Sequence, residues 1–141
     1  MEGNKQIVRD ALASFGEGDY EGFLSLFSDD CVFTLGGNLF DVTKVEGKAA
    51  FRELLQFGFS GDPENGYNGL VGPIRFEIEM LLTDGNRVID ISRGFSHTTE
   101  GDREYNNSYC RIWEIEQGRV VSMIEFLDTA HFNRTVLQSE T

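Results

Sequence analysis

Residues Ile74–His97 read IRFEIEMLLTDGNRVIDISRGFSH and carry the clearest structural pattern of the chain. Apolar residues alternate with charged residues on the N-terminal side of Asp84 and Gly85, and a second strand-like run follows them. A period of two is typical of a β-strand, and Asp-Gly between two such runs favours a tight turn. The stretch therefore predicts an antiparallel β-hairpin.

Pairing the two strands around Asp84 and Gly85 predicts which residues face each other. The pairs are Leu82 with Arg87, Met80 with Ile89, Ile78 with Ile91, Phe76 with Arg93, and Ile74 with Phe95. Arg93 is therefore expected on the apolar face of the hairpin. Asp90 falls opposite Glu79 on the other face, where two like charges are tolerable only if water reaches them, so we expect Asp90 to be solvated.

A second hairpin is predicted from Tyr105–Glu116 and Arg119–Asp128, with Gln117-Gly118 as its turn. This register places Cys110 opposite Glu125. The face that carries Glu125 then also holds Val121, Met123, Leu127, Asn106, Ser108, Cys110 and Ile112. The other face holds Val120, Ile124, Phe126, Tyr109, Arg111 and Trp113. Both faces are substantially apolar, so we expect one to cover the core and the other to form a homodimer through the sheet.

Glu125 interrupts the apolar run Val120–Leu127. Burying an unpaired charge is costly, so such a residue is paired, protonated or used in chemistry. In one interpretation, Glu125 accepts and returns a proton inside a low-dielectric cavity, and Arg93 stabilises a developing oxyanion or grips a substrate carboxylate. In the other, the two residues form a buried structural ion pair, or each reaches solvent at its own edge.

The first half of the chain is predicted to be mostly helical. Apolar residues recur at helical spacing within Ile7–Phe15, in the segment after the potential N-cap Asp19, and within Ala49–Leu55. A short strand is expected at Cys31–Leu35, after a turn. The segment Ser60–Gly69 is rich in glycine, asparagine and proline, which predicts the longest loop of the chain.

The composition favours one compact domain over residues 1–141, because a chain of 141 residues with twelve phenylalanines can bury a substantial core. The net charge of -12 and the lack of a basic patch disfavour nucleic acid and anionic membranes as partners. No apolar run approaches membrane-spanning length, and the first residues show no signal core. Cys31 and Cys110 stand alone among apolar neighbours, which indicates reduced thiols and a cytoplasmic location.

The order of these elements resembles the NTF2-like superfamily, in its SnoaL-like or ketosteroid-isomerase-like branch. The resemblance is carried by Gly18–Phe33, Val45–Lys48, Tyr105–Asn107 and Ile124–Thr129. It implies an α+β fold in which about three N-terminal helices pack on a curved antiparallel sheet, forming a cone with a ligand pocket inside. In that family the last strand often points an acid into the cone, and Glu125 matches this position.

The catalytic groups of known family members match this chain only in part. Steroid isomerases use a tyrosine on the first helix and a base on the first strand, where this chain has Ala11 and Leu35. The related epoxide hydrolases use a tyrosine and an asparagine on the first strand, where this chain has Phe33 and Leu35, and an Arg-x-Asp on a middle strand. Arg93 is a displaced approximation to that arginine, and the last-strand acid Glu125 is retained.

The expected site therefore has Glu125 and Arg93 as catalytic residues. The expected ligand contacts are Tyr67, Phe76, His97, Asn106, Ser108, Cys110 and Met123. No metal is expected, because neither histidine sits at ligand spacing from another ligating residue, and no external cofactor is expected. The predicted function is cofactor-independent proton transfer on a small hydrophobic metabolite, by an enzyme of isomerase, cyclase, hydratase or hydrolase type. The alternative is a non-catalytic ligand-binding or dimerisation module with the same pocket.

Overall fold

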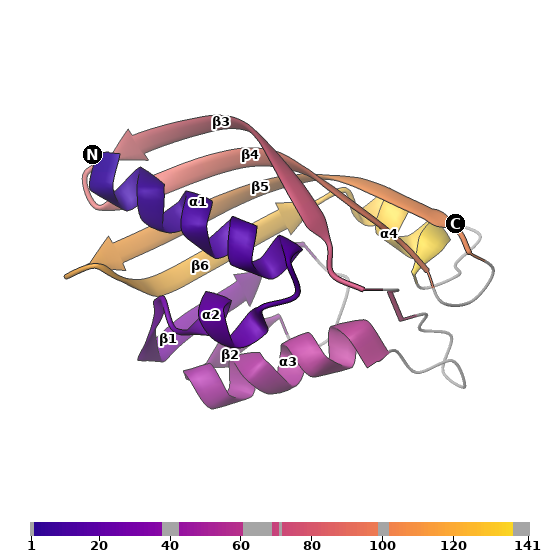
Figure 1. Cartoon of the computed structure of the whole chain (residues 1–141), viewed down its shortest axis with the longest axis horizontal. Coiled ribbons are helices and arrows are strands. Elements are labelled where there is room, and N and C mark those ends of the chain that lie inside the picture. Colours follow the sequence, from indigo (N-terminus) through magenta and orange to yellow (C-terminus); the bar gives the residue numbers. More distant parts are fainter. Residues whose placement is uncertain (1, 38–42, 61–68, 71, 99–101, 137–141) are drawn as a thin grey trace.

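A computed structural model describes residues 2–37, 43–60, 69–70, 72–98 and 102–136, and it places helices against one face of a curved sheet (Figure 1). The elements, in chain order, are α1 (Glu2–Gly16), α2 (Tyr20–Leu24), β1 (Phe27–Leu35), β2 (Lys44–Glu46), α3 (Lys48–Ser60), β3 (Arg75–Asp84), β4 (Arg87–His97), β5 (Glu104–Glu116), β6 (Arg119–Leu127) and α4 (Thr129–Thr135). None of the helices in these ranges is long and apolar enough to span a membrane.

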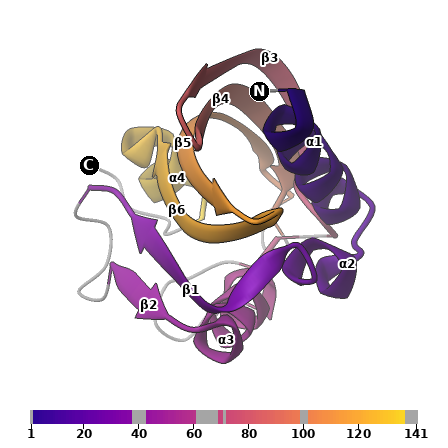
Figure 2. The ribbon, with the colours of Figure 1, turned by 90° about the vertical axis from the view of Figure 1, so that its left-hand side faces the viewer.

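The six strands form one sheet in the order β2-β1-β6-β5-β4-β3. All neighbours are antiparallel except β1 and β6, which run parallel, so the sheet is mixed where an antiparallel one was expected. Viewed from the side, the sheet curves from β3 round to β1 and β2, with α1 and α2 along its hollow side and α3 beside β1 (Figure 2). This arrangement confirms the α+β cone that the resemblance implied.

The predicted helices and hairpins are all present. Asp19 caps α2 as expected, and its Oδ1 accepts a hydrogen bond from the Gly22 N–H at 2.9 Å. Two elements were missed. Strand β2 is only three residues long, and α4 begins after Asp128, whose Oδ1 accepts hydrogen bonds from the backbone N–H groups of Ala130 and His131. His131 therefore lies in a helix that the sequence analysis did not predict.

The predicted register of the first hairpin is wrong. The turn residues are Gly85 and Asn86, because Asp84 pairs with Arg87, and the strands are displaced by two residues from the predicted pairing. The register shifts again between Ile78 and Met80, which leaves Glu79 as the extra residue of a β-bulge. Beyond this bulge, Phe76 pairs with Gly94 and Arg93 pairs with Glu77. Asp90 lies opposite Leu81 and is fully buried, so its expected solvation is also wrong.

The second hairpin has the predicted turn and a different register beyond it. Glu116 pairs with Arg119, as expected for a turn at Gln117-Gly118. Ile115 then pairs with Val120 and Glu114 pairs with Ser122, so Val121 is an extra residue. A shift of one residue moves every following side chain to the other face relative to the neighbouring strand. As a result Glu125 faces Arg111, and Cys110 faces Phe126.

Aromatic rings from the helices and the sheet make up most of the core. Phe23 on α2 lies 5.1 Å from Phe15 on α1 and 4.8 Å from Phe27 on β1, measured between ring centroids. Phe27 in turn lies 5.3 Å from Phe51 on α3 and 6.0 Å from Trp113 on β5. Such ring pairs add to the free energy gained by burying their area. These ring contacts therefore join α1, α2 and α3 to the sheet.

Candidate functional site

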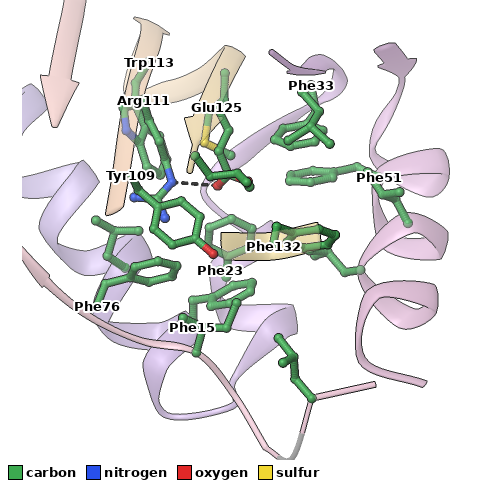
Figure 3. Close-up of a pocket in the computed structure, with 18 of the residues that line it drawn as sticks. Phe15, Phe23, Phe33, Phe51, Phe76, Tyr109, Arg111, Trp113, Glu125 and Phe132 are labelled. Atoms are coloured by element: carbon green, nitrogen blue, oxygen red, sulfur yellow. Dashed lines mark hydrogen bonds and ion pairs between the residues drawn. The ribbon is translucent and has the colours of Figure 1, made fainter. Parts of the chain in front are cut away.

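A cavity of about 400 Å³ lies between the inner face of the sheet and the helices (Figure 3). Its walls are mostly aromatic, and the rings come from all parts of the fold, including Phe15, Phe33, Phe51, Phe76, Trp113 and Phe132. This volume and this largely apolar lining are typical of small-molecule sites. The cavity is the candidate functional site.

The cavity depends on the absence of a side chain at one position of β4. A Cβ atom on Gly94 would lie 2.8 Å from Cε1 of Phe76 and 2.8 Å from Cε1 of Tyr109. Both rings line the cavity and meet edge to face, with their centroids 5.0 Å apart. The glycine thus lets the two rings lie directly on the strand.

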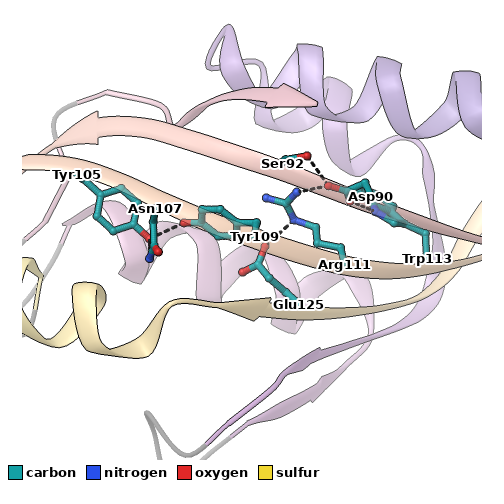
Figure 4. A network of polar contacts seen from close by, with 8 residues as sticks. All are labelled: Asp90, Ser92, Tyr105, Asn107, Tyr109, Arg111, Trp113 and Glu125. Carbon is teal, nitrogen blue, oxygen red and sulfur yellow. Dashed lines mark hydrogen bonds and ion pairs between the residues drawn. The ribbon is translucent and has the colours of Figure 1, made fainter. Parts of the chain in front are cut away.

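A buried ion-pair network forms the polar part of the cavity wall (Figure 4). Nε of Arg111 lies 2.8 Å from Oε2 of Glu125, and Nη1 of Arg111 lies 3.0 Å from Oδ1 of Asp90. The exposed fractions of these side chains are 2% for Arg111, 19% for Glu125 and 0% for Asp90. Glu125 and Arg111 line the cavity, and Asp90 lies behind them.

Several contacts make the burial of Arg111 tolerable. Burial by itself lowers the pKa of Arg111, but the carboxylates of Glu125 and Asp90 outweigh that effect and raise the pKa above its ordinary value. The guanidinium carbon also lies 4.1 Å from the ring centroid of Phe76 and 4.7 Å from that of Tyr109. Contacts with the faces of aromatic rings stabilise a cation that has lost its water. Arg111 is therefore a fixed cation.

Asp90 is held by three donors. Besides Arg111, it accepts hydrogen bonds from Trp113 Nε1 at 2.6 Å and from Ser92 Oγ at 2.5 Å. A fully buried carboxylate is costly unless it is paired and hydrogen-bonded, and here both conditions are met. Asp90 thus anchors Arg111, which in turn orients Glu125 at the cavity wall.

Two tyrosines form a second polar group in the lining. The hydroxyl groups of Tyr105 and Tyr109 are hydrogen-bonded to each other. Nδ2 of Asn107 donates to the Tyr105 hydroxyl at 3.0 Å and to the carbonyl of Asp128 at 3.2 Å. Burial, with smaller contributions from Tyr105 and Glu125, raises the pKa of Tyr109 well above its ordinary value. Tyr109 therefore stays a neutral phenol around neutral pH.

Three of the residues expected in the site line the cavity, namely Glu125, Met123 and Phe76. Arg93 lies on the opposite face of the sheet. Its Nη2 donates to Asn106 Oδ1 at 2.7 Å, and its Nη1 donates to Ser108 Oγ at 3.1 Å. The expectation that Arg93 shares a cavity with Glu125 is therefore wrong. The bulge at Val121 moves Glu125 to the other face of β6 relative to β5. The bulge at Glu79 pairs Phe76 with Gly94, so that Phe76 lies on the inner face and Arg93 does not.

The other expected contacts are also displaced from the cavity. Asn106, Ser108 and Cys110 occupy the outer face with Arg93, since they alternate with the cavity-lining residues of β5. His97 stands at the exposed end of β4, where its Nε2 lies 3.8 Å from Oδ1 of Asp102. Tyr67 lies outside the described residues.

The sequence interpretation missed Asp90, Arg111 and Tyr109. A usable signal was present, because an acid and an arginine sit at the centres of two neighbouring strands, each among residues otherwise suited to a buried face. The structure pairs Asp90 directly with Arg111 across β4 and β5. This pair depends on the register between β4 and β5, which neither of the two predicted hairpins describes.

Comparisons with known proteins agree with this fold. Residues 8–123 match the family model described as the SnoaL-like domain. Among solved structures, an NTF2-like protein of unknown function from Burkholderia pseudomallei is 19% identical with a TM-score of 0.80, and the match covers 96% of this chain and 98% of that one. A putative isomerase from Bacillus subtilis is 20% identical with a TM-score of 0.76, over 95% of this chain and 92% of that one.

A third similar structure is an LEH-like epoxide hydrolase from M. tuberculosis, which is 17% identical with a TM-score of 0.70, over 98% of this chain and 92% of that one. At these identities the likeness to solved structures shows the fold alone. No curated protein matches the sequence.

Proposed function

Because the chain belongs to the SnoaL-like domain family, we propose that it is an enzyme acting on a small hydrophobic metabolite, with Glu125 as the group that accepts and returns a proton. The proposal covers reactions of isomerase, cyclase, hydratase or hydrolase type without an external cofactor. It is carried by one observation. Among the described residues, Glu125 supplies the only carboxylate in the lining of an otherwise largely apolar cavity.

The surroundings of Glu125 suit a general base. Its Oε2 is held by Arg111, and no hydrogen bond to its Oε1 is found within the described part of the chain. A base that is fixed in place and screened from water needs little reorganisation when the proton moves. In this proposal Arg111 and Asp90 are positioning residues, since they act on the substrate through Glu125.

The proton transfer that fits this arrangement begins next to a carbonyl group. Glu125 removes a proton from the carbon beside the carbonyl, and the electron pair of the broken C–H bond moves into the carbonyl to give an enolate. Glu125 is then the neutral acid. When the substrate has a carbon–carbon double bond next to the deprotonated carbon, this enolate is conjugated with it. Returning the proton to the far carbon of that double bond moves the double bond next to the carbonyl, which completes an isomerisation with no net gain or loss of electrons.

A probe reaction tests the base without knowledge of the natural substrate. In 5-nitrobenzisoxazole, a base removes the ring C–H proton, the N–O bond breaks and a coloured cyanophenolate forms. We expect the protein to accelerate this reaction above the rate with acetate at equal concentration, and Glu125→Gln to reduce that acceleration by about 100-fold or more. Glu116→Gln, at the exposed end of β5, is the matched control and should react like the wild type. Equal rates for the protein and acetate would contradict the proposed base.

The pairing of Glu125 with Arg111 also suits a second function, the non-catalytic recognition of a small hydrophobic ligand. A screen of a metabolite extract separates the two. A compound that is bound and chemically changed supports the enzyme, whereas a compound that is bound and released unchanged, together with no reaction of 5-nitrobenzisoxazole, supports the binding module.

We also propose that the outer face of the sheet forms a homodimer. Met80, Ile91, Cys110 and Phe126 form one row across β3, β4, β5 and β6, since each pairs with the next. Met80 and Phe126 are 48% and 46% exposed, so large apolar side chains of this row meet water in the single chain. A second copy of the chain would cover the row.

The two free cysteines, Cys31 and Cys110, support a reducing compartment, which we propose to be the cytoplasm.

A further inference from the structure

We propose further that the cavity selects an uncharged ring compound with one acceptor oxygen, such as a ketone, and rejects the carboxylate of the same skeleton. The oxygen accepts a hydrogen bond from the Tyr109 hydroxyl. This inference rests on the proposed function in one respect, in that it takes the same cavity as the binding site.

The charges around the cavity carry the first part of the argument. Among the described residues that line it, Arg111 and Glu125 are the only charged ones. Together with Asp90 behind them, they amount to two carboxylates and one guanidinium, a net charge of -1 (from -1, +1 and -1). Both Nε and Nη1 of Arg111 already donate to these carboxylates. A ligand carboxylate would therefore bring a second uncompensated negative charge into an apolar space, which is costly.

The hydrogen-bond donor for the ligand follows from the orientation of Asn107. Its Oδ1 accepts from the backbone N–H of Ser108 at 2.8 Å, so this end of the amide must be the oxygen. Its Nδ2 is then the donor to the Tyr105 hydroxyl, at 3.0 Å. When the Tyr105 hydroxyl donates the hydrogen bond to the Tyr109 oxygen, the hydrogen of the Tyr109 hydroxyl points away from Tyr105. In our proposal it points into the cavity.

The position of Tyr109 agrees with this role. Figure 3 shows the oxygen of Tyr109 directed into the cavity, on a wall next to the one that carries Glu125. Successive hydrogen bonds from Asn107 through Tyr105 to Tyr109 polarise one another in the same direction. Since burial raises the pKa of Tyr109, its hydroxyl keeps its proton and can donate it to a ligand oxygen.

Three probes with one saturated bicyclic skeleton test this selection: 2-decalone, 2-methylenedecalin and decalin-2-carboxylate. They present a ketone, a hydrocarbon of the same shape and an anion at the same carbon. Trp113 is the only tryptophan of the chain and lines the cavity, so its fluorescence reports binding. None of the probes absorbs strongly where tryptophan does.

The wild type should bind the ketone and bind the carboxylate about 100-fold more weakly at pH 8. Tyr109→Phe should weaken ketone binding about tenfold and leave hydrocarbon binding within about twofold. Tyr20→Phe is the matched control, because Tyr20 is outside the cavity lining, and it should change neither. Glu125→Gln should strengthen carboxylate binding about tenfold, because it brings the net charge of the cluster to zero.

The controls separate recognition from folding. Hydrocarbon binding by Tyr109→Phe shows that the cavity is intact, and if that variant does not fold, Tyr105→Phe should still show a selective loss of ketone affinity. Equal binding of ketone and carboxylate, or an equal loss of ketone and hydrocarbon in Tyr109→Phe, would overturn the inference and leave the proposed function standing. If no probe binds, the proposed site fails as well. If the selection is as expected but 5-nitrobenzisoxazole does not react, only the proposed catalysis fails.

Discussion

Arg111 and Glu125 lie directly opposite each other on β5 and β6, and their Nε and Oε2 atoms are 2.8 Å apart. The contact joins a fully buried cation to the one carboxylate that faces the cavity within the described residues. Asp90, on β4, holds the other side of the guanidinium. The ion-pair network of the candidate site therefore takes one side chain from each of three neighbouring strands, and of these three only Glu125 keeps appreciable exposure.

Replacing Glu125 with glutamine should leave stability nearly unchanged. The glutamine oxygen can still accept the hydrogen bond from Arg111, which also keeps its pairing with Asp90. The cluster loses its excess negative charge, so we expect a free energy of unfolding within about 1 kcal/mol of the wild type, or higher. Urea denaturation measures it. A loss of several kcal/mol would show that Glu125 serves mainly as a structural partner of Arg111.

Replacing Asp90 with alanine should be far more damaging. The change strips an acceptor from Arg111 Nη1 and from Trp113 Nε1, which both lie in the buried layer. Breaking a buried ion pair by removing one partner costs about 3–5 kcal/mol, and we expect a loss of this size in urea denaturation. Asp29→Ala is the control, because the Asp29 side chain is fully exposed. A similar small effect for both variants would contradict the anchoring role of Asp90.

His131 should make the protein less stable in mild acid. Its Nε2 accepts a hydrogen bond from the backbone N–H of Asn106 at 3.1 Å, and burial lowers its pKa in the folded chain. The unfolded chain, with a histidine pKa of about 6.5, therefore binds this proton more strongly. The stabilisation is present above about pH 6.5 and is lost as the pH falls through the lower folded-state pKa.

The pH dependence can be assigned because the chain has only two histidines. Thermal unfolding of the wild type between pH 7.5 and 5, compared with His131→Gln, should show a smaller fall in Tm for the variant. His97→Gln is the control, since that ring stands at the exposed end of β4. Parallel curves for the wild type and His131→Gln would rule out this histidine as the source.

Gly94→Ala should close part of the cavity. The new methyl group would meet Cε1 of both Phe76 and Tyr109 at 2.8 Å, so at least one ring must move. Overpacking of this kind costs about 1–3 kcal/mol, and the displaced ring should reduce the binding of 2-decalone. Gly3→Ala, where nothing lies within 4 Å of the added carbon, is the control. Unchanged binding by Gly94→Ala would show that the rings can move without filling the site.

Ile91→Lys should convert the proposed dimer to single chains. Ile91 lies inside the apolar row, between Met80 and Cys110, so a lysine there would bring two positive charges together across the proposed interface. Sedimentation equilibrium should give the mass of two chains for the wild type and of one chain for the variant. Ile91→Val is the conservative control. A wild-type mass of one chain would contradict the dimer.

Much of the fold could be predicted because it depends on regular periods. Strand alternation located both hairpins, helical spacing located α1 to α3, and Asp19 was correctly identified as a cap. Glu125 could also be singled out, since a carboxylate in an apolar strand has few acceptable environments. These inferences required only the neighbours of each residue along the chain.

The partners of Glu125 could not be predicted in the same way, because they depend on registers between strands. The first turn uses Gly85 and Asn86, and this slide by two residues keeps the faces but replaces Glu79 with Leu81 opposite Asp90. The predicted neighbour of Asp90, Glu79, is charged and had suggested that Asp90 is solvated, whereas the observed neighbour, Leu81, is apolar. In the second hairpin, Val121 is apolar like the residues around it, so nothing in the alternation marks it as an extra residue.

The bulge at Val121 also affects how relatives of this chain should be compared. A strand presents alternate residues to the same side, so one residue inserted or removed is half a period. Two homologous chains can therefore carry the same acid at the same distance from the end of the domain and point it in opposite directions. Two observations distinguish a cone with the acid inside from a cone with the acid on its outer surface. They are the number of residues between the hairpin turn and the acid, and the position of any residue that has no partner on the neighbouring strand.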